Sequence, residues 1–302
     1  MIRQKMGLTK PADYITTPPK SMRQNWPVWA LLFLLSTLLP ACSPHRFFYQ
    51  PTRQLYSDPA ARGIIYDAIE FPSFNGKMLK AILFKTNQPP KGTVVHCHGN
   101  YGNISSHYMG SQYLTHYGFD VLVFDYQGYG GSQGRPTPRG TVEDGIAAVR
   151  YAQTHLRNPG TGVVLLGQSL GGAVGTVVAA KEPLVKGVVL EAAFYSYASM
   201  ARDVLKRSVL LWPLYPIYPL LMGGTYNPSR HIAAISPRPV LLIHGNKDKV
   251  VPSGMSEKLY RKAKEPKRLW IIDGAGHMGC WRAQGKVYEK TIADFFEAAL
   301  QK

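Results

Sequence analysis

The sequence predicts an α/β fold, with a mainly parallel sheet covered by helices on both faces. Short runs rich in Val, Ile and Leu recur along the chain, and stretches of helical character separate them. Seven runs are expected to be strands: residues 79–85, 93–97, 120–124, 163–166, 187–191, 239–244 and 268–272. Continuous apolar runs of this length are typical of strands that are buried on both faces. Their alternation with helices predicts parallel strands with helical connections.

Five helices are expected between or after these strands: residues 106–117, 141–155, 171–181, 255–263 and 283–300. In the second helix, Thr141 is followed three residues later by Asp144, a spacing that indicates an N-terminal cap.

One connection is too long for this alternation. More than 40 residues separate Glu191 from Pro239, and ordinary connections are much shorter. Prolines recur there about every three residues, which prevents a continuous helix. We therefore expect residues 195–235 to form a lid with a buried apolar underside. Three aromatic residues are expected to bind the substrate: Trp212, Tyr215 and Tyr218. The alternative is that they only pack the lid onto the sheet.

The N-terminal region has the features of an export signal. Residues 26–41 form an apolar run that follows Lys20 and Arg23 and contains two prolines. The run is short for a membrane-spanning helix, which needs about 20 apolar residues. Leu39-Pro40-Ala41-Cys42 resembles a bacterial lipobox, although Pro40 replaces its usual small residue. An uncleaved anchor and a plain secretory signal are the alternatives.

This interpretation predicts a lipid on Cys42 and three regions. Residues 1–41 are the signal peptide, with Met22 as an alternative start, residues 42–60 are a lipid-anchored linker, and residues 61–302 are the catalytic domain. The expected location is the cell envelope, with the protein lipid-anchored to a membrane. Ser43, rather than an acidic residue, follows the cysteine, and similar Gram-negative lipoproteins go to the periplasmic side of the outer membrane.

The formal net charge of +17 raises the question of a nucleic-acid partner. The basic residues are scattered, without a basic helix, zinc-ligand spacing or an aromatic RNA-binding motif, so no nucleic-acid partner is predicted. A basic surface would also favour contact with anionic lipid. Downstream of Cys42 only Cys97 and Cys280 remain, and two buried thiols are expected, with a bridge as the alternative.

Gly167-Gln168-Ser169-Leu170-Gly171 lies between an expected strand and an expected helix. This strand–turn–helix context is the one required for a nucleophilic serine on a sharp turn. The glycines permit the turn, and the helix N-terminus supplies amides for a developing oxyanion. A phosphate-binding loop is the alternative, but Ala173 stands where its lysine should be.

Three further motifs complete a candidate site. Asp248 follows the expected strand 239–244, and His277 lies in a glycine-rich loop after the last strand. Ser169, Asp248 and His277 therefore occur in the order of a nucleophile, an acid and a base. Glu191 is the rival acid. The backbone amides of Asn100 and Leu170 are the candidate oxyanion hole.

Two other motifs suggest a metal site and a dinucleotide-binding site, and we reject both interpretations. His96 and His98 share a strand face, but no third ligand accompanies them, so no metal site is predicted. The glycine-rich run after residue 124 lacks the third glycine of a dinucleotide motif, which would fall at Gln133.

Together these motifs resemble the α/β-hydrolase superfamily from about Ile64 to the C-terminus, and the branch of lysophospholipase-like and serine-aminopeptidase-like members in particular. The resemblance implies ester or amide hydrolysis through an acyl-enzyme intermediate, with no metal or organic cofactor. It implies no particular substrate, since this fold hosts many.

Three classes of function follow from this resemblance. A serine hydrolase acting on hydrophobic or lipid-like carboxylic esters is favoured, because the expected lid is apolar and the chain has a predicted membrane tether. The alternatives are a serine peptidase or amidase on the same residues, and a non-catalytic surface lipoprotein. The expected partners are a small-molecule or lipid ester and, through the anchor, a membrane.

Overall fold

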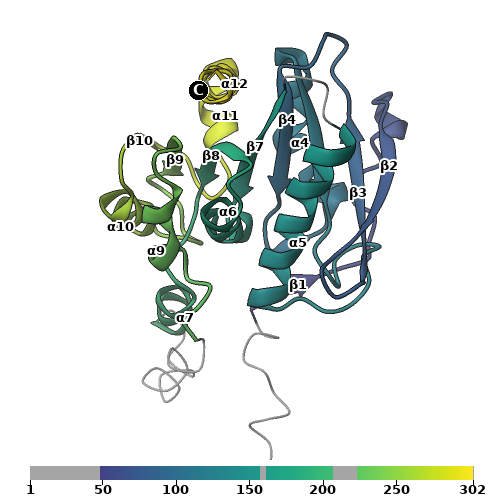
Figure 1. Cartoon of the computed structure of the whole chain (residues 1–302). Coiled ribbons are helices and arrows are strands. Elements are labelled where there is room, and N and C mark those ends of the chain that lie inside the picture. The colour runs from purple at the N-terminus through teal and green to yellow at the C-terminus, as the bar shows by residue number, and fades with distance from the viewer. Residues whose placement is uncertain (1–47, 157–160, 207–222, 302) are drawn as a thin grey trace, which may run out of the picture. The chain divides into compact units, whose positions relative to one another are not determined.

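The computed structural model describes residues 48–156, 161–206 and 223–301, and its central feature there is a sheet of eight strands (Figure 1). The order across the sheet is β10-β9-β8-β7-β4-β6-β3-β2. The strands are β2 (Asp67–Pro72), β3 (Met78–Phe84), β4 (Gly92–Cys97), β6 (Phe119–Phe124), β7 (Gly162–Gln168), β8 (Val185–Glu191), β9 (Val240–Gly245) and β10 (Lys267–Ile272). β3 runs antiparallel to both of its neighbours, β2 and β6, and the other neighbouring pairs of this sheet are parallel. The predicted α/β fold with a mainly parallel sheet is confirmed.

The central strands are buried on both faces, because alternate side chains enter two different cores. In β7, Val163 and Leu165 pack into one hydrophobic cluster, while Val164 and Leu166 pack into the other. This is why the strand appears in the sequence as one continuous apolar run.

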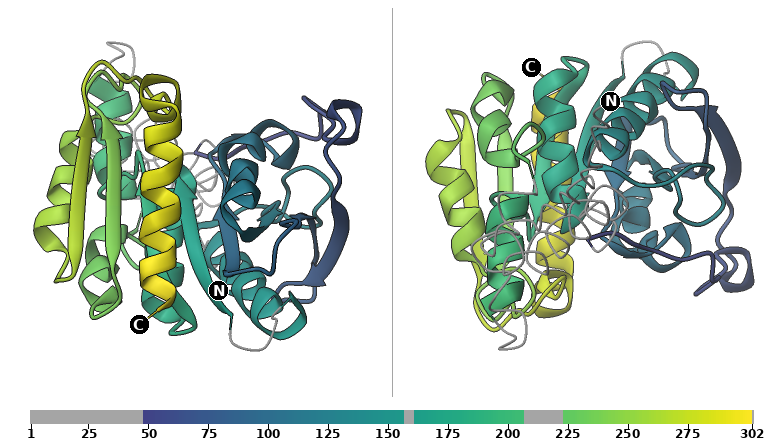
Figure 2. Two further views of the ribbon diagram at one scale, coloured as in Figure 1. Left: turned by 90° about the horizontal axis from the view of Figure 1, so that it is seen from above. Right: turned by 90° about the horizontal axis from the view of Figure 1, so that it is seen from below.

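Helices supply the other half of each core. On one side are α5 (Pro138–Tyr151), α6 (Leu170–Lys181) and α10 (Gly254–Lys262). On the other are α3 (Ile104–His107), α4 (Met109–Gln112), the 3-10 segment Tyr113–Tyr117 and α12 (Lys286–Leu300). In Figure 1, α12 lies above the strands and α6 below them, and the two opposite views of Figure 2 show these layers from either side.

The seven expected strands are all present within two residues of their expected ends, but several helix details differ. The expected helix 106–117 is three short segments, and the expected helix 283–300 is α11 (Cys280–Gln284) and α12, separated by Gly285 at φ 52°. The cap of α5 is Thr137, whose hydroxyl accepts the Gly140 amide, rather than Thr141. The edge strand β2 was not expected, because its partly exposed residues form no continuous apolar run.

The lid and linker regions are described only in part. Residues 195–235 include α7 (Tyr197–Lys206), α9 (Pro228–His231) and the 3-10 segment Ile232–Ile235, whereas Trp212, Tyr215 and Tyr218 lie outside the described residues. The first strand, β1 (Gln50–Pro51), falls within the expected linker and pairs with β5 (Tyr101–Gly102). This part of the chain is therefore a component of the fold rather than a free connection. Among the described residues, no helix has the length and apolar character needed to cross a bilayer.

Helix α6 approaches the end of β4 so closely that only glycine fits between them. A Cβ on Gly171 would lie 1.8 Å from the carbonyl oxygen of Cys97, and one on Gly167 would lie 2.4 Å from the carbonyl oxygen of Gly171. Both obstacles are backbone atoms, which cannot move aside as a flexible side chain can. The two glycines therefore allow a tight turn between β7 and α6.

We predict that Gly171→Ala lowers the free energy of unfolding by about 3 kcal/mol, at the upper end of overpacking costs. For a domain of this size the melting temperature should fall by about 6–12 °C. Gly254→Ala is the matched control, because a Cβ there meets no atom within 4 Å. Equal melting temperatures for the two variants in a thermal unfolding experiment would contradict the close packing.

Candidate active site

Ser169 stands at the turn between β7 and α6, in a backbone conformation that non-glycine residues seldom adopt. Its φ is 54° and its ψ is −113°. Its amide donates to the carbonyl of Glu191 on the neighbouring strand at 2.8 Å, which holds the strained turn against the sheet. Leu170 is the first residue of α6, so its amide has no acceptor within the helix.

The structure brings Ser169, His277 and Asp248 into one chain of hydrogen-bond contacts. His277 Nε2 lies 3.1 Å from Ser169 Oγ, and His277 Nδ1 lies 2.7 Å from Asp248 Oδ2. The three residues follow β7, β10 and β9, so they meet at the carboxyl edge of the parallel strands. This is the arrangement in which a histidine can take a proton from a serine while a carboxylate orients the ring.

Asp248 is held as a carboxylate by a full set of donors. Its Oδ1 accepts the amides of Val250 and Val251 at 2.8 and 2.9 Å. Burial alone would raise the pKa of Asp248, but hydrogen bonds from His244, His277 and the Val251 amide outweigh it and hold the pKa well below its ordinary value. The group is therefore ionised at neutral pH, as required to stabilise a positive charge on His277.

His244 also contacts Asp248, and the sequence analysis did not predict this contact. Its ring is fully buried, with Nε2 3.1 Å from Asp248 Oδ2 and Nδ1 2.7 Å from the hydroxyl of Ser256. Asp248 therefore lies between two imidazoles. The available sequence signal was a histidine at the end of an apolar strand, four residues before the candidate acid.

The rival acid, Glu191, contacts other residues and not His277. Its carboxylate accepts from the side-chain amide of Gln168 at 2.7 Å and from the hydroxyl of Tyr288 at 2.8 Å. Because Gln168 precedes Ser169, these contacts support the turn from behind. Asp248, and not Glu191, contacts His277 in the structure.

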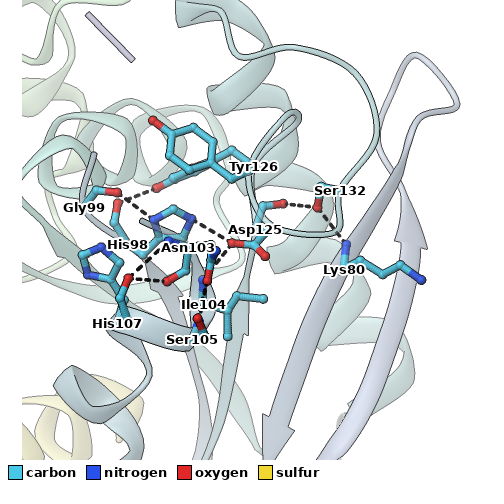
Figure 3. A network of polar contacts seen from close by, with 12 residues as sticks. Lys80, His98, Gly99, Asn103, Ile104, Ser105, His107, Asp125, Tyr126 and Ser132 are labelled. Atoms are coloured by element: carbon cyan, nitrogen blue, oxygen red, sulfur yellow. Dashed lines mark hydrogen bonds and ion pairs between the residues drawn. The ribbon is translucent and has the colours of Figure 1, made fainter. Parts of the chain in front are cut away.

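The loop after β4 carries Asn100, the other candidate oxyanion residue, and a buried polar network fixes this loop (Figure 3). His98 is fully buried, and its Nδ1 lies 2.7 Å from the carbonyl of Gly99. Asp125, at the end of β6, accepts the Ile104 amide at 2.8 Å and lies 3.5 Å from His98 Nε2. Ser132 links Asp125 to the amide of Lys80 on β3.

His96 and the two cysteines near the site are buried. His96 is buried, with Nδ1 2.8 Å from the hydroxyl of Ser111. Cys97 and Cys280 are buried free thiols, so the alternative of a bridge is wrong for this structure. Burial raises the pKa of Cys97 to about 12, which keeps this thiol protonated. Within the described ranges, no cluster of three or more potential metal ligands is found.

Ser169 and His277 open into a cavity of about 730 Å³, within the range of small-molecule sites. Asn100 also lines it, which places the loop after β4 beside the serine. Most of the other described lining residues are apolar, and none of them is an acid, a lysine or an arginine. They are Phe48, Gln50, Gly99, Tyr101, His107, Met200, Ala201, Val204, Leu205, Val250 and Met278. Such a lining suits a hydrophobic group that is held next to the serine.

Comparisons with known proteins agree with this fold. The family model described as "Serine aminopeptidase, S33" matches residues 88–235. The Escherichia coli K12 protein YfhR, itself uncharacterised, is 33% identical over 262 residues, covering 84% of this chain and 87% of that protein. A yeast protein described as the uncharacterised membrane protein YNL320W is 29% identical over 214 residues, covering 70% and 72%. The Pyrococcus furiosus esterase Pf2001 superposes with a TM-score of 0.70 at 20% identity, over 83% of this chain and 97% of that one.

These findings define the class of protein. The chain belongs to the α/β-hydrolase superfamily, because the Arabidopsis thaliana α/β-hydrolase domain-containing protein WAV2 is 31% identical to it over 259 residues, covering 79% of this chain and 81% of that protein. The similarity to YfhR likewise extends over most of both chains. Only one residue in five is identical to the esterase, so the structural likeness shows a shared fold and nothing about the reaction.

We predict that Asp248→Asn lowers turnover of p-nitrophenyl acetate by about 10⁴-fold, because an amide would favour the wrong tautomer of His277. Glu191→Gln is the comparison variant and should lose far less, because its carboxylate contacts Gln168 and Tyr288. Steady-state kinetics of both variants would measure the difference. The reversed order of losses would identify Glu191 as the acid.

Proposed function

We propose that this protein is a serine hydrolase that cleaves carboxylic esters of hydrophobic acids through an acyl-enzyme intermediate. The observation that carries the proposal is the contact chain from Ser169 Oγ through His277 to Asp248 at one end of an apolar cavity. The nucleophile, the base and the group that orients the base each have the partner their chemistry requires.

In the acylation step, His277 Nε2 takes the hydroxyl proton as Ser169 Oγ attacks the carbonyl carbon of the ester. The positive charge that develops on His277 is stabilised by the carboxylate of Asp248 at 2.7 Å. The tetrahedral intermediate then collapses, the bond to the leaving oxygen breaks, and His277 returns the proton to the departing alcohol. The acyl group remains bonded to Ser169 Oγ as an ester.

In the deacylation step, water takes the place of the alcohol. His277 removes a proton from the water as it attacks the acyl carbon, and the same proton returns to Ser169 when the acid leaves. In both steps the backbone amides of Asn100 and Leu170 are expected to donate hydrogen bonds to the oxyanion. Donors of this kind contribute roughly 2.7–4 kcal/mol each in other serine hydrolases.

The cavity favours esters of hydrophobic acids over the main alternative. That alternative, an aminopeptidase, is suggested by the description of the matching family model. Such an enzyme must recognise the charged N-terminal ammonium of a peptide, which calls for nearby carboxylates. The described lining instead offers apolar side chains such as Met200, Leu205 and Val250, which favour an acyl chain.

We predict that Ser169→Ala reduces ester hydrolysis by about 10⁶-fold with unchanged circular dichroism, because the nucleophile is lost while its small side chain is nearly retained. The wild-type protein should cleave p-nitrophenyl esters with a preference for medium chains over acetate, and faster than aminoacyl p-nitroanilides. A variant that keeps more than a few percent of wild-type turnover would disprove the role of Ser169. Faster cleavage of the anilides would instead favour the peptidase.

We propose further that the protein is held at a membrane of the cell envelope through a lipid on Cys42. The motif Leu39-Pro40-Ala41-Cys42 supports the lipid, and the yeast relative described as a membrane protein supports the membrane location. Phe48 lines the cavity only six residues after Cys42, a span of at most about 22 Å of extended chain. A lipid on Cys42 would therefore keep the cavity close to the bilayer surface.

We predict that Cys42 is the first residue of the mature protein and carries a diacylglyceryl group, since stable anchoring needs more than one acyl chain. Mass spectrometry of the protein purified from membranes should find this adduct and no peptide from residues 1–41. Cys42→Ser is the matched variant and should lack the adduct. An intact segment 26–42 in the mature wild-type protein would contradict the prediction and favour an uncleaved anchor.

A further inference from the structure

Residues 48–57, here called the N-terminal strap, lie along the loop that follows β4. The strap contains β1, which pairs in parallel with β5 of that loop through Gln50–Tyr101 and Pro51–Gly102. It lies outside residues 88–235, where the family model matches. The loop is the one that carries Asn100, so the strap contacts a candidate oxyanion residue of the proposed site.

The side chain of Asn100 forms two hydrogen bonds to the first part of the strap. Its Nδ2 donates to the carbonyl of Phe48 at 2.6 Å, and its Oδ1 accepts the amide of Gln50 at 3.1 Å. The same Oδ1 accepts the hydroxyl of Tyr129 at 2.8 Å. The orientation of Asn100 is therefore set by the strap on one side and by the glycine-rich turn after β6 on the other.

A second asparagine clamps the middle of the strap. Asn103 is buried, and its Nδ2 donates to the carbonyls of Thr52 and Gln54 at 2.9 and 2.8 Å. The amide of Gly130 donates to the same Thr52 carbonyl at 3.0 Å. Farther along, the amide of Tyr56 donates to the hydroxyl of Ser105 at 3.0 Å. The strap is thus bonded along its length and cannot swing away without breaking several hydrogen bonds.

The strap also forms part of the cavity wall. Phe48 and Gln50 both line the cavity. The ring of Phe48 packs edge-to-face on Phe194 and Tyr197, with centroids 5.7 and 5.0 Å away. Tyr197 begins α7, and the same helix supplies lining residues from Met200 to Leu205. Phe48 therefore joins the loop beside the serine to the helix that forms another wall.

We propose that the strap forms part of the substrate-binding site. Phe48 is a specificity-determining residue for the acyl chain, and the Asn100 side chain is a positioning residue. By clamping the strap, the Asn100 side chain holds its own backbone amide where the oxyanion forms. This inference rests on the proposed esterase function and adds the residues that set its chain-length preference.

The first test is Phe48→Ala in the full-length protein. Removing the ring takes away apolar surface that an octanoyl chain would contact and an acetyl group would not reach. The ratio of kcat/KM for p-nitrophenyl octanoate to that for the acetate should fall about tenfold, mainly through KM. Phe48→Leu should recover part of that ratio. Phe74→Ala is the matched control, because Phe74 is exposed and lies outside the cavity lining, and its ratio should equal that of the wild type.

The second test is Asn100→Ala, which removes both bonds to the strap and leaves the backbone amide in place. A small displacement of an oxyanion donor lowers kcat on every ester, so kcat should fall about 100-fold for octanoate and acetate alike, with a smaller change in KM. Asn100→Asp keeps an acceptor for Gln50 and Tyr129 and loses the donor to Phe48, so it should be intermediate. Thermal unfolding of each variant would identify any that fail to fold.

The outcomes separate this inference from the proposed function. If Ser169→Ala abolishes hydrolysis while Phe48→Ala keeps the wild-type ratio and Asn100→Ala keeps the wild-type kcat, the enzyme is an esterase and the strap is only structural. If the wild-type protein hydrolyses no ester, calorimetric binding of octanoate still tests the strap. Phe48→Ala should then raise the dissociation constant about tenfold relative to Phe74→Ala, and equal constants would overturn the assignment.

Discussion

The backbone contact between helix α6 and the end of β4 is the constraint on which the rest of the site depends. Gly171 leaves no room for a Cβ beside the Cys97 carbonyl, so the turn that carries Ser169 is pressed against the loop that carries Asn100. The bond from the Ser169 amide to the Glu191 carbonyl holds the turn against the sheet from the other side. A serine in a strained conformation is thereby fixed at the end of β7. His277 contacts it from the loop after β10, and Asp248 contacts His277 from the loop after β9.

Much of this arrangement could be predicted from the sequence, because it depends on short-range patterns. The buried strands are continuous apolar runs, and the glycines around Ser169 mark the sharp turn within five residues. Asp248 and His277 each follow directly after such a run. In a parallel sheet the carboxyl ends of the strands share one edge, so three residues that each follow an expected strand are expected at that edge.

The features that were missed depend on contacts between distant or weakly patterned segments. The strap is bonded to residues about 50 positions further along, and nothing in its own sequence distinguishes it from a linker. His244 lies in an apolar strand four residues before Asp248, and this position alone does not show which residue the buried ring contacts. The break at Gly285 has no proline to mark it, and a single glycine is tolerated in many helices.

The central claim is that Ser169 is a nucleophile activated by His277. The most direct measurement is covalent labelling of the wild-type protein with an alkyl fluorophosphonate, followed by peptide mass spectrometry. The account predicts one phosphonyl group per chain, located on Ser169, and loss of ester hydrolysis in proportion to labelling. Labelling that leaves Ser169 unmodified while hydrolysis continues would contradict it.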